Sequence, residues 1–133
     1  MACFRDLIVY RKAFELSMLV YHLSKRFPTE ERYSLTDQCR RSSRSVGAQI
    51  AEAYRRRKYP AHFVAKLTDA DAENCETQSW MDQAMGCGYL TSQDVQPIED
   101  LSQEVGNLLG SMMRDHEKWC LPPWKFPAKT KIQ

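Results

Sequence analysis

Long apolar runs are absent from this sequence of 133 residues, in which no stretch approaches the roughly 20 residues that a membrane-spanning helix needs. The start of the chain also lacks the basic-then-apolar order of a secretory signal, because Arg5 and Asp6 come early and charge interrupts the apolar residues that follow. The 19 basic and 17 acidic residues leave a net charge of only +2, which excludes a histone-like polycation and an acidic tail protein. We therefore expect a cytoplasmic protein with no membrane partner.

Cysteine and histidine are too scattered to indicate a metal site or a disulfide framework. The five cysteines are odd in number and no pair has C-x-x-C spacing, so we expect reduced thiols. His22, His62 and His116 lie far apart in the sequence. Glu73 and Glu76 lack the following histidine of the Glu-x-x-His pairs that hold di-iron centres in helical bundles. The sequence therefore predicts no metal and no cofactor.

Catalytic motifs are missing as well. There is no glycine-rich phosphate loop, no G-x-S-x-G nucleophile turn and no H-E-x-x-H zinc motif. Ser42, Ser43 and Ser45 lie near arginines but have no histidine base nearby in sequence, so they are better explained as small packing residues than as nucleophiles. We therefore expect that the protein is not an enzyme.

Glycine is scarce, proline falls at the edges of segments and β-branched alternation is lacking, which together favour an all-α chain. Apolar spacing predicts four helices, over residues of about 6–26, 30–58, 60–87 and 92–118. Asp6 can cap the first helix, and Thr91 with Asp94 resembles a capping box at the start of the fourth. Long helices with short links predict a single-domain antiparallel up-down four-helix bundle over residues 1–119, followed by an irregular tail over 120–133.

The first predicted helix is apolar over roughly 220° of its circumference, which is wider than a helix packed on one side requires. One apolar face contains Leu7, Tyr10, Phe14, Met18 and Tyr21. A second face also contains aliphatic residues, and a helix with two apolar faces needs neighbours on two sides. A second chain can supply one of them. We assign the subunit interface to residues of this second face and to one side of the third helix: Val9, Leu16, Val20, Leu23, Asp69, Glu73, Glu76 and Trp80.

One polar residue, Asn74, falls on the inner face of the third helix. It either makes a buried hydrogen bond that sets the helix register or lines a central channel of an oligomer, and the sequence does not separate these two roles.

The second helix carries the most specific chemical feature of the chain, a basic face. Residues 37–58 contain seven basic residues against two acidic ones, whereas residues 61–85 contain five acidic residues against one lysine. Arginine forks bind phosphate bidentately, and several on one helix side can follow a nucleic-acid backbone, although no aromatic residue interleaves these arginines. The basic residues of one arc are Arg40, Arg41, Arg44, Arg55 and Lys58, with Arg56 and Arg57 as auxiliaries.

Two functions follow from this face. In the first, a non-enzymatic oligomer binds the backbone of RNA or DNA, with weak sequence preference. In the second, the basic face is used in subunit or partner contacts with acidic residues such as those of the third helix, and the protein is an interaction scaffold.

Several short motifs, in their order and spacing, resemble a known bacterial family. They are Phe4-Arg5-Asp6-Leu7, Phe27-Pro28 followed by Glu31 and Tyr33, Leu35-Thr36-Asp37-Gln38-Cys39-Arg40-Arg41-Ser42, Ser45-Val46, Gln49-Ile50-Ala51-Glu52-Ala53 and Gly88-Tyr89-Leu90. Over roughly residues 4–115 the chain resembles the four-helix-bundle family named for open reading frames in intervening sequences of large-subunit ribosomal RNA genes, which is also labelled ribosomal-protein-like.

The resemblance implies a ring-shaped homopentamer of four-helix bundles. A related branch, the accessory variability determinant of diversity-generating retroelements, is a basic pentameric barrel that binds nucleic acid and a reverse transcriptase. Ala53 stands where the family usually has glycine, so we expect the second helix to run on through Arg57. The net charge of +2 is lower than that of the retroelement branch, which makes a reverse transcriptase a less favoured partner.

Overall fold

The computed structural model describes residues 3–121, and all regular structure within this range is helical. Four long helices account for most of it, with three short helical turns at their ends. The elements are η1 (Phe4–Asp6), α1 (Ile8–Ser24), η2 (Thr29–Glu31), α2 (Leu35–Arg55), α3 (Pro60–Gly86), α4 (Ser92–Arg114) and α5 (His116–Trp119). The tail expected over residues 120–133 lies outside the described residues from 122 onward.

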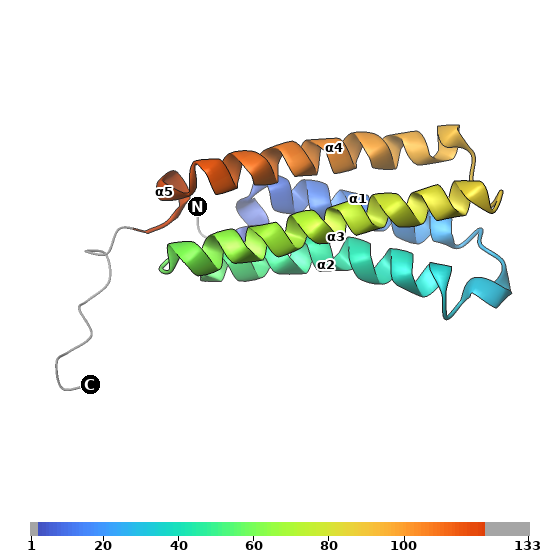
Figure 1. Cartoon of the computed structure of the whole chain (residues 1–133), viewed down its shortest axis with the longest axis horizontal. Coiled ribbons are helices and arrows are strands. Elements are labelled where there is room, and N and C mark those ends of the chain that lie inside the picture. The colour runs from blue at the N-terminus through green and yellow to red at the C-terminus, as the bar shows by residue number, and fades with distance from the viewer. Residues whose placement is uncertain (1–2, 122–133) are drawn as a thin grey trace.

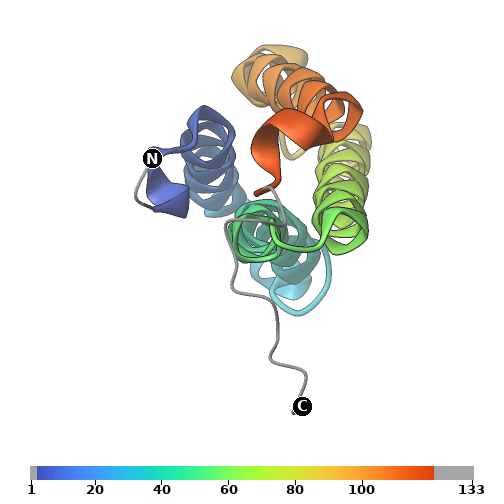
Figure 2. The ribbon, with the colours of Figure 1, turned by 90° about the vertical axis from the view of Figure 1, so that its left-hand side faces the viewer.

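The four long helices lie side by side and form a helical bundle (Figures 1 and 2). Helix α1 contacts α2 and α4, and α3 contacts the same two helices, so that each long helix has two neighbours. Viewed end-on in Figure 2, the four helices occupy the corners of a quadrilateral around a shared core. This arrangement leaves one side of every helix facing away from its own chain.

Side chains from the inward faces of all four helices fill the core. Val46, Phe63 and Leu109 meet towards one end of the bundle, and Met81 and Ile98 meet in a second group of buried residues. All five side chains are at most 1% exposed. Helical periodicity determines which residues of one helix share a side, and the apolar spacing of α2, α3 and α4 accounts for their inward faces.

The apolar face of α1 that was assigned to a subunit interface lies largely in the core of its own chain. Val9, Leu16 and Val20, assigned to a subunit interface, are at most 3% exposed and belong to the core of their own chain. Leu23 is half-buried against the same core. Phe14, on the other face, is 53% exposed. Since a side chain covered by its own chain is not accessible to a second subunit, the assignment of the three buried residues to an interface is corrected.

The ends of the first two long helices differ from the predicted ones. Helix α1 begins after Leu7, which makes no side-chain cap, and the Asp6 carboxylate instead accepts from the Cys3 backbone within η1. Helix α2 begins only at Leu35 and ends at Arg55, because Arg56 leaves helical geometry with φ −101° and ψ 11°. The expected continuation through Arg57 is therefore wrong.

The start of α4 confirms the predicted capping box. The Thr91 backbone N–H donates to Asp94 Oδ2 at 2.8 Å, and the Asp94 N–H donates to Thr91 Oγ1 at 3.1 Å. These two bonds satisfy amide groups that have no partner within the helix. The helix then runs to Arg114, and α5 follows as a separate turn, so the predicted single helix to residue 118 is broken near its end.

Polar bonds between helices fix their relative register inside the core. Asn74 is 2% exposed and donates through Nδ2 to the backbone oxygen of Ser102 at 2.9 Å, while Ser102 Oγ donates to Asn74 Oδ1 at 2.7 Å. One turn further along α3, the hydroxyls of Thr77 and Ser42 of α2 are 2.8 Å apart. Asn74 thus takes the first of its two predicted roles, a buried hydrogen-bonding residue within one chain.

Candidate nucleic-acid interface

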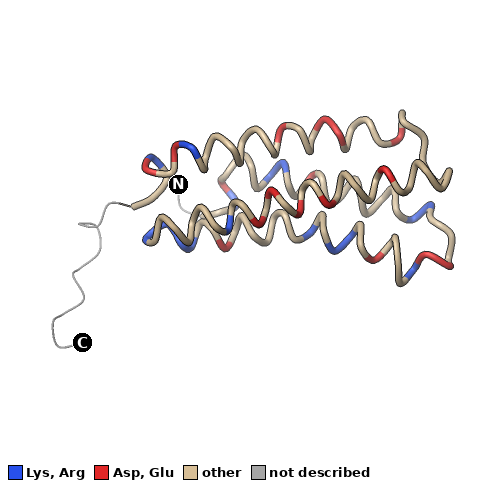
Figure 3. The backbone as a smooth tube through the Cα atoms, viewed as in Figure 1, with Lys and Arg blue, Asp and Glu red and all other residues tan. Residues whose placement is uncertain are grey.

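Positive and negative charge separate between neighbouring helices, as the sequence predicted. Figure 3 shows blue segments along α2 and red segments along α3. The two helices are in direct contact, so the basic and acidic side chains are close enough to pair. Which arginines pair, and which do not, decides what the basic face can bind.

Arg41 is neutralised by the acidic side of α3. Its guanidinium Nη1 lies 3.0 Å from Glu73 Oε2, and its Nη2 donates to Glu76. Glu76 also accepts from Trp80 Nε1 at 3.1 Å, which holds the carboxylate against α3. The scaffold alternative expected the basic face to pair with acidic residues, and Arg41 makes such a pairing within its own chain. Glu73, Glu76 and Trp80, expected at a subunit interface, therefore make these contacts inside their own chain, while Asp69 is exposed.

Arg40 and Arg44 lie on another side of α2 and gather around an aromatic ring from α1. The Arg40 guanidinium carbon is 4.8 Å from the centre of the Tyr21 ring and that of Arg44 is 6.0 Å from it, while the Lys25 ammonium approaches to 4.6 Å. Arg40 is also anchored by its Nε, which donates to Ser24 Oγ at 2.8 Å. Cations prefer the negative face of an aromatic ring. No aromatic residue interleaves these arginines along α2 itself, and the ring beside them comes from a different helix, α1.

Lys25, Arg40 and Arg44 border a polar cleft of about 420 Å³ at the end of α1 and the start of α2, which we call the basic cleft. Four cationic side chains line it, and Asp37 supplies the single carboxylate. Two of the cations, Lys25 and Arg32, come from outside α2. The angular positions of residues around α2 could not identify these two cations, because such positions relate only the residues of one helix to one another. The cationic lining residues are Lys25, Arg32, Arg40 and Arg44.

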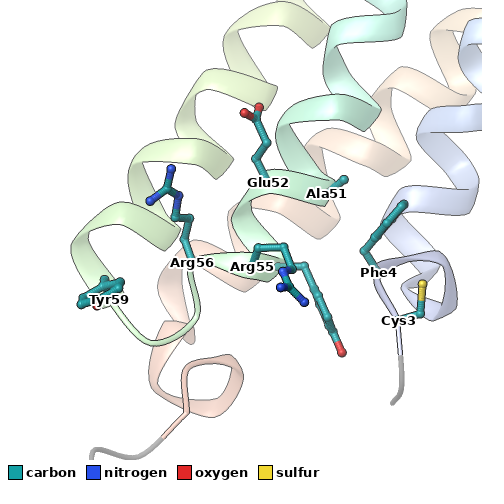
Figure 4. Close-up of a pocket in the computed structure, with 8 residues that line it drawn as sticks. Cys3, Phe4, Ala51, Glu52, Arg55, Arg56 and Tyr59 are labelled. Atoms are coloured by element: carbon teal, nitrogen blue, oxygen red, sulfur yellow. The ribbon is translucent and has the colours of Figure 1, made fainter. Parts of the chain in front are cut away.

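Two more basic residues, at the end of α2 and just after it, line a larger groove of about 630 Å³, which we call the aromatic groove (Figure 4). Arg55 and Arg56 line it together with Phe4, Tyr54 and Tyr59. Both arginines are exposed, and Figure 4 shows them leaving the end of α2 in different directions. A groove that combines guanidinium groups with aromatic rings suits a nucleic acid, since the former bind phosphate and the latter stack on bases.

Arg57 and Lys58 each lie against a tyrosine ring of their own chain. Arg57 packs on Tyr54 with its guanidinium carbon 3.8 Å from the ring centre, and its Nε donates to the Tyr54 carbonyl at 2.9 Å. The Lys58 ammonium lies 5.7 Å from the centre of the Tyr59 ring. Since α2 ends at Arg55, Lys58 does not continue the helical arc on which it was placed.

A third depression of about 280 Å³ lies between α1 and α2, and we call it the apolar groove. It is bordered by Arg44, which also lines the basic cleft, and by Phe4 and Ala51, which also line the aromatic groove. Exposed Phe14 forms part of its wall. One continuous surface over α1 and α2 is therefore basic at both ends and apolar between them.

Other chemistry is sparse in residues 3–121. They contain no group of three or more His, Cys, Asp or Glu side chains able to hold a metal ion. His116 and Cys120 are one helical turn apart, a pair that the sequence reading missed, but no third ligand joins them. The thiol of Cys39 is buried, and burial raises its pKa to about 12. None of the helices in this range is long and apolar enough to cross a membrane.

The fold and this surface define an all-helical bundle protein with a basic face on one helix. Residues 5–111 match the family described as 23S rRNA-intervening sequence protein, and the chain belongs to this family. This membership confirms the resemblance seen in the sequence motifs.

A solved structure supports the same assignment. The chain is similar to a protein with unknown function from the S23 ribosomal protein family of Bacteroides thetaiotaomicron VPI-5482, with 30% sequence identity and a TM-score of 0.72. The similarity covers 80% of this chain and 98% of the other. Comparison with curated proteins found no match.

Proposed function

We propose that the protein is a non-enzymatic, cytoplasmic helical bundle that binds the backbone of RNA or DNA through unpaired arginines of α2 and of the residue that follows it. The observation that carries this proposal is the difference between Arg41 and three other arginines. Arg41 is paired with two glutamates, whereas Arg44, Arg55 and Arg56 are exposed and form no ion pair within residues 3–121. Exposed guanidinium groups without acidic partners remain available to phosphate oxygens.

The spacing of these arginines suits a polymer better than a small ligand. Arg44 and Arg55 are eleven residues apart on one helix, which corresponds to about 16 Å along its axis. Several phosphates of an extended strand fit within that length, and the aromatic residues near Arg55 offer stacking surfaces for bases. The family description refers to 23S rRNA, which supports RNA as the first polymer to test.

We also propose that the bundle is antiparallel and up-down, and that it assembles as a ring-shaped homopentamer. The reversal of chain direction from each long helix to the next in Figure 1 supports the first part. Support for assembly comes from the outward face of α1, where Phe14 is 53% exposed beside an apolar groove. Apolar surface of this kind commonly marks a protein interface. The exposed apolar face of α1 also favours the alternative function, an interaction scaffold that binds proteins and no nucleic acid.

The test is equilibrium binding of a mixed-sequence single-stranded RNA by two charge variants. We expect the triple variant Arg44→Gln/Arg55→Gln/Arg56→Gln to bind at least about tenfold more weakly than the wild type. Arg41→Gln is the matched control and retains wild-type affinity, because its guanidinium is already paired. Equal affinity of the wild type and the triple variant would contradict the proposal and favour the scaffold.

A further inference from the structure

The basic cleft concentrates positive charge that its own chain does not neutralise. Lys25, Arg32, Arg40 and Arg44 line it and form no ion pair within residues 3–121, and Asp37 is the single acidic lining residue. The adjacent Arg26, by contrast, has an acidic partner in Asp94 at 2.9 Å. The chain thus pairs a neighbouring cation and leaves these four unpaired. Like charges at short range repel each other, and a bound anion would remove that repulsion.

The position of Arg40 is already fixed before any ligand arrives. Its Nε donates to Ser24 Oγ, and Ser24 Oγ in turn donates to the Tyr21 carbonyl at 2.8 Å. The guanidinium also lies against the Tyr21 ring, whose other cationic neighbour at short distance is Lys25. One of the five N–H donors of Arg40 is used by Ser24, so its terminal amino groups remain for a ligand. A donor held in place loses little entropy when it binds.

From this geometry we propose that the basic cleft is a binding site for a terminal phosphate group, as in a phosphomonoester or pyrophosphate. Its volume of about 420 Å³ falls within the range of about 300–1,000 Å³ that is usual for ligand sites. Four cations against one carboxylate exceed what a phosphodiester with a single negative charge requires. A terminal phosphate carries a charge of about −1.5 to −2 and three acceptor oxygens, which suits this set better. The hydroxyls of Thr29 and Thr36 also line the cleft and can donate to further oxygens.

This inference goes beyond the proposed function, because a small phosphate compound can occupy the cleft without any polymer. The same phosphate chemistry occurs at the 5′ end of a nucleic acid and in free pyrophosphate. These two sources differ in one respect that can be measured. If the source is a nucleic-acid end, an oligonucleotide binds more tightly with a 5′-phosphate than with a 5′-hydroxyl.

The experiment is calorimetric titration of the full chain with pyrophosphate at low salt. The cleft variant is Lys25→Gln/Arg32→Gln, both of which are exposed side chains. The control Arg55→Gln/Arg56→Gln removes the same charge at the far end of α2. We expect the cleft variant to bind pyrophosphate about tenfold or more weakly, and the control to bind within about twofold of the wild type. Circular dichroism verifies that both variants keep the helical content of the wild type.

The outcomes separate this proposal from the proposed function. No pyrophosphate binding by the wild type, or an equal loss in both variants, would overturn the cleft assignment. RNA binding by the wild type without pyrophosphate binding would overturn the cleft alone and leave the proposed function standing. Pyrophosphate binding without RNA binding would support the cleft and contradict the proposed function. A preference of about tenfold for the 5′-phosphorylated oligonucleotide supports a nucleic-acid end as the source, and equal binding supports free phosphate compounds.

Discussion

The Arg41 guanidinium lies 3.0 Å from the Glu73 carboxylate, across the contact between α2 and α3. Arg44, one helical turn further along α2, faces the Tyr21 ring instead and has no acidic partner within residues 3–121. Two arginines that are neighbours in sequence therefore differ in what they can bind. Whether a basic side chain of α2 is available to phosphate depends more on an acidic residue of the adjacent helix than on its angular position around α2.

Because Arg41 is paired with acidic residues of its own chain, we expect its substitution to change stability slightly and to leave RNA binding unchanged. Replacing Arg41 with Gln should lower the free energy of unfolding by about 0.5 kcal/mol, because a partly exposed surface ion pair contributes little. Chemical denaturation of Arg41→Gln, Glu73→Gln and the double variant measures the coupling between the two side chains. Additive effects of the two substitutions would contradict a direct pair.

A structural feature could be predicted from the sequence when it depends on the residues of one helix. It could not when it depends on how two helices pack against each other. The inward faces of α2 to α4 and the Thr91 capping box follow from residues within single helices, and the capping box was predicted. Leu16 and Phe14 lie on different apolar faces of α1, and the sequence analysis assigned the face of Leu16, which points inward, to a subunit interface. Which apolar face of α1 points inward depends on where α2 and α4 lie relative to α1. The angular positions of residues around a single helix do not contain that information.

The same reason explains what was missed in the candidate site. The basic residues of α2 were identified from charge alone, but Tyr21, Lys25 and Arg32 join Arg40 only when other segments pack beside α2. The premature end of α2 at Arg55 was also missed. No glycine marks this end, and the helix closes there through the Arg56 N–H, which donates to the Ala53 carbonyl.

The buried pair of Asn74 and Ser102 predicts a specific loss of stability. Asn74→Ala should lower the free energy of unfolding by about 1–3 kcal/mol, because it leaves the buried Ser102 hydroxyl without the acceptor to which it donates. Urea denaturation measures this change. Asn107→Ala, at an exposed position of the same bundle, is the control and should change stability by less than about 0.5 kcal/mol. Similar effects of both substitutions would contradict the role of Asn74.

Leu16 is buried and Phe14 is exposed, so substitutions at these two positions of α1 should have different consequences. Leu16→Ala removes a side chain that is 0% exposed and should lower the free energy of unfolding by about 2–5 kcal/mol. Phe14→Ser changes an exposed side chain and should weaken assembly while leaving the fold of the chain intact. Light scattering gives the mass, which for a pentamer is near five times the 15.5 kDa of one chain. A wild-type mass of 15.5 kDa at micromolar concentration would contradict the oligomer.

The ion pair of Arg26 with Asp94 predicts a dependence of stability on pH. The Arg26 guanidinium and the Thr91 backbone N–H lower the pKa of Asp94 from 3.8 to about 2. A carboxyl whose pKa is lower in the folded state stabilises the fold above its unfolded pKa, and this contribution disappears as the pH falls through the folded pKa. Asp94→Asn should therefore be less stable than the wild type at neutral pH, and the difference should shrink towards pH values of about 2. A difference that is independent of pH would contradict this assignment.

The salt dependence of RNA binding tests the central claim most directly. For a single strand, the logarithm of affinity falls with the logarithm of salt concentration by about 0.7 for each phosphate neutralised. If Arg44, Arg55 and Arg56 each neutralise one phosphate, the triple glutamine variant should have a slope smaller by about 2 than that of the wild type. Arg41→Gln should keep the wild-type slope, because its guanidinium is paired with Glu73 and Glu76. No binding by the wild type at low salt, or the same slope for the triple variant, would contradict the account.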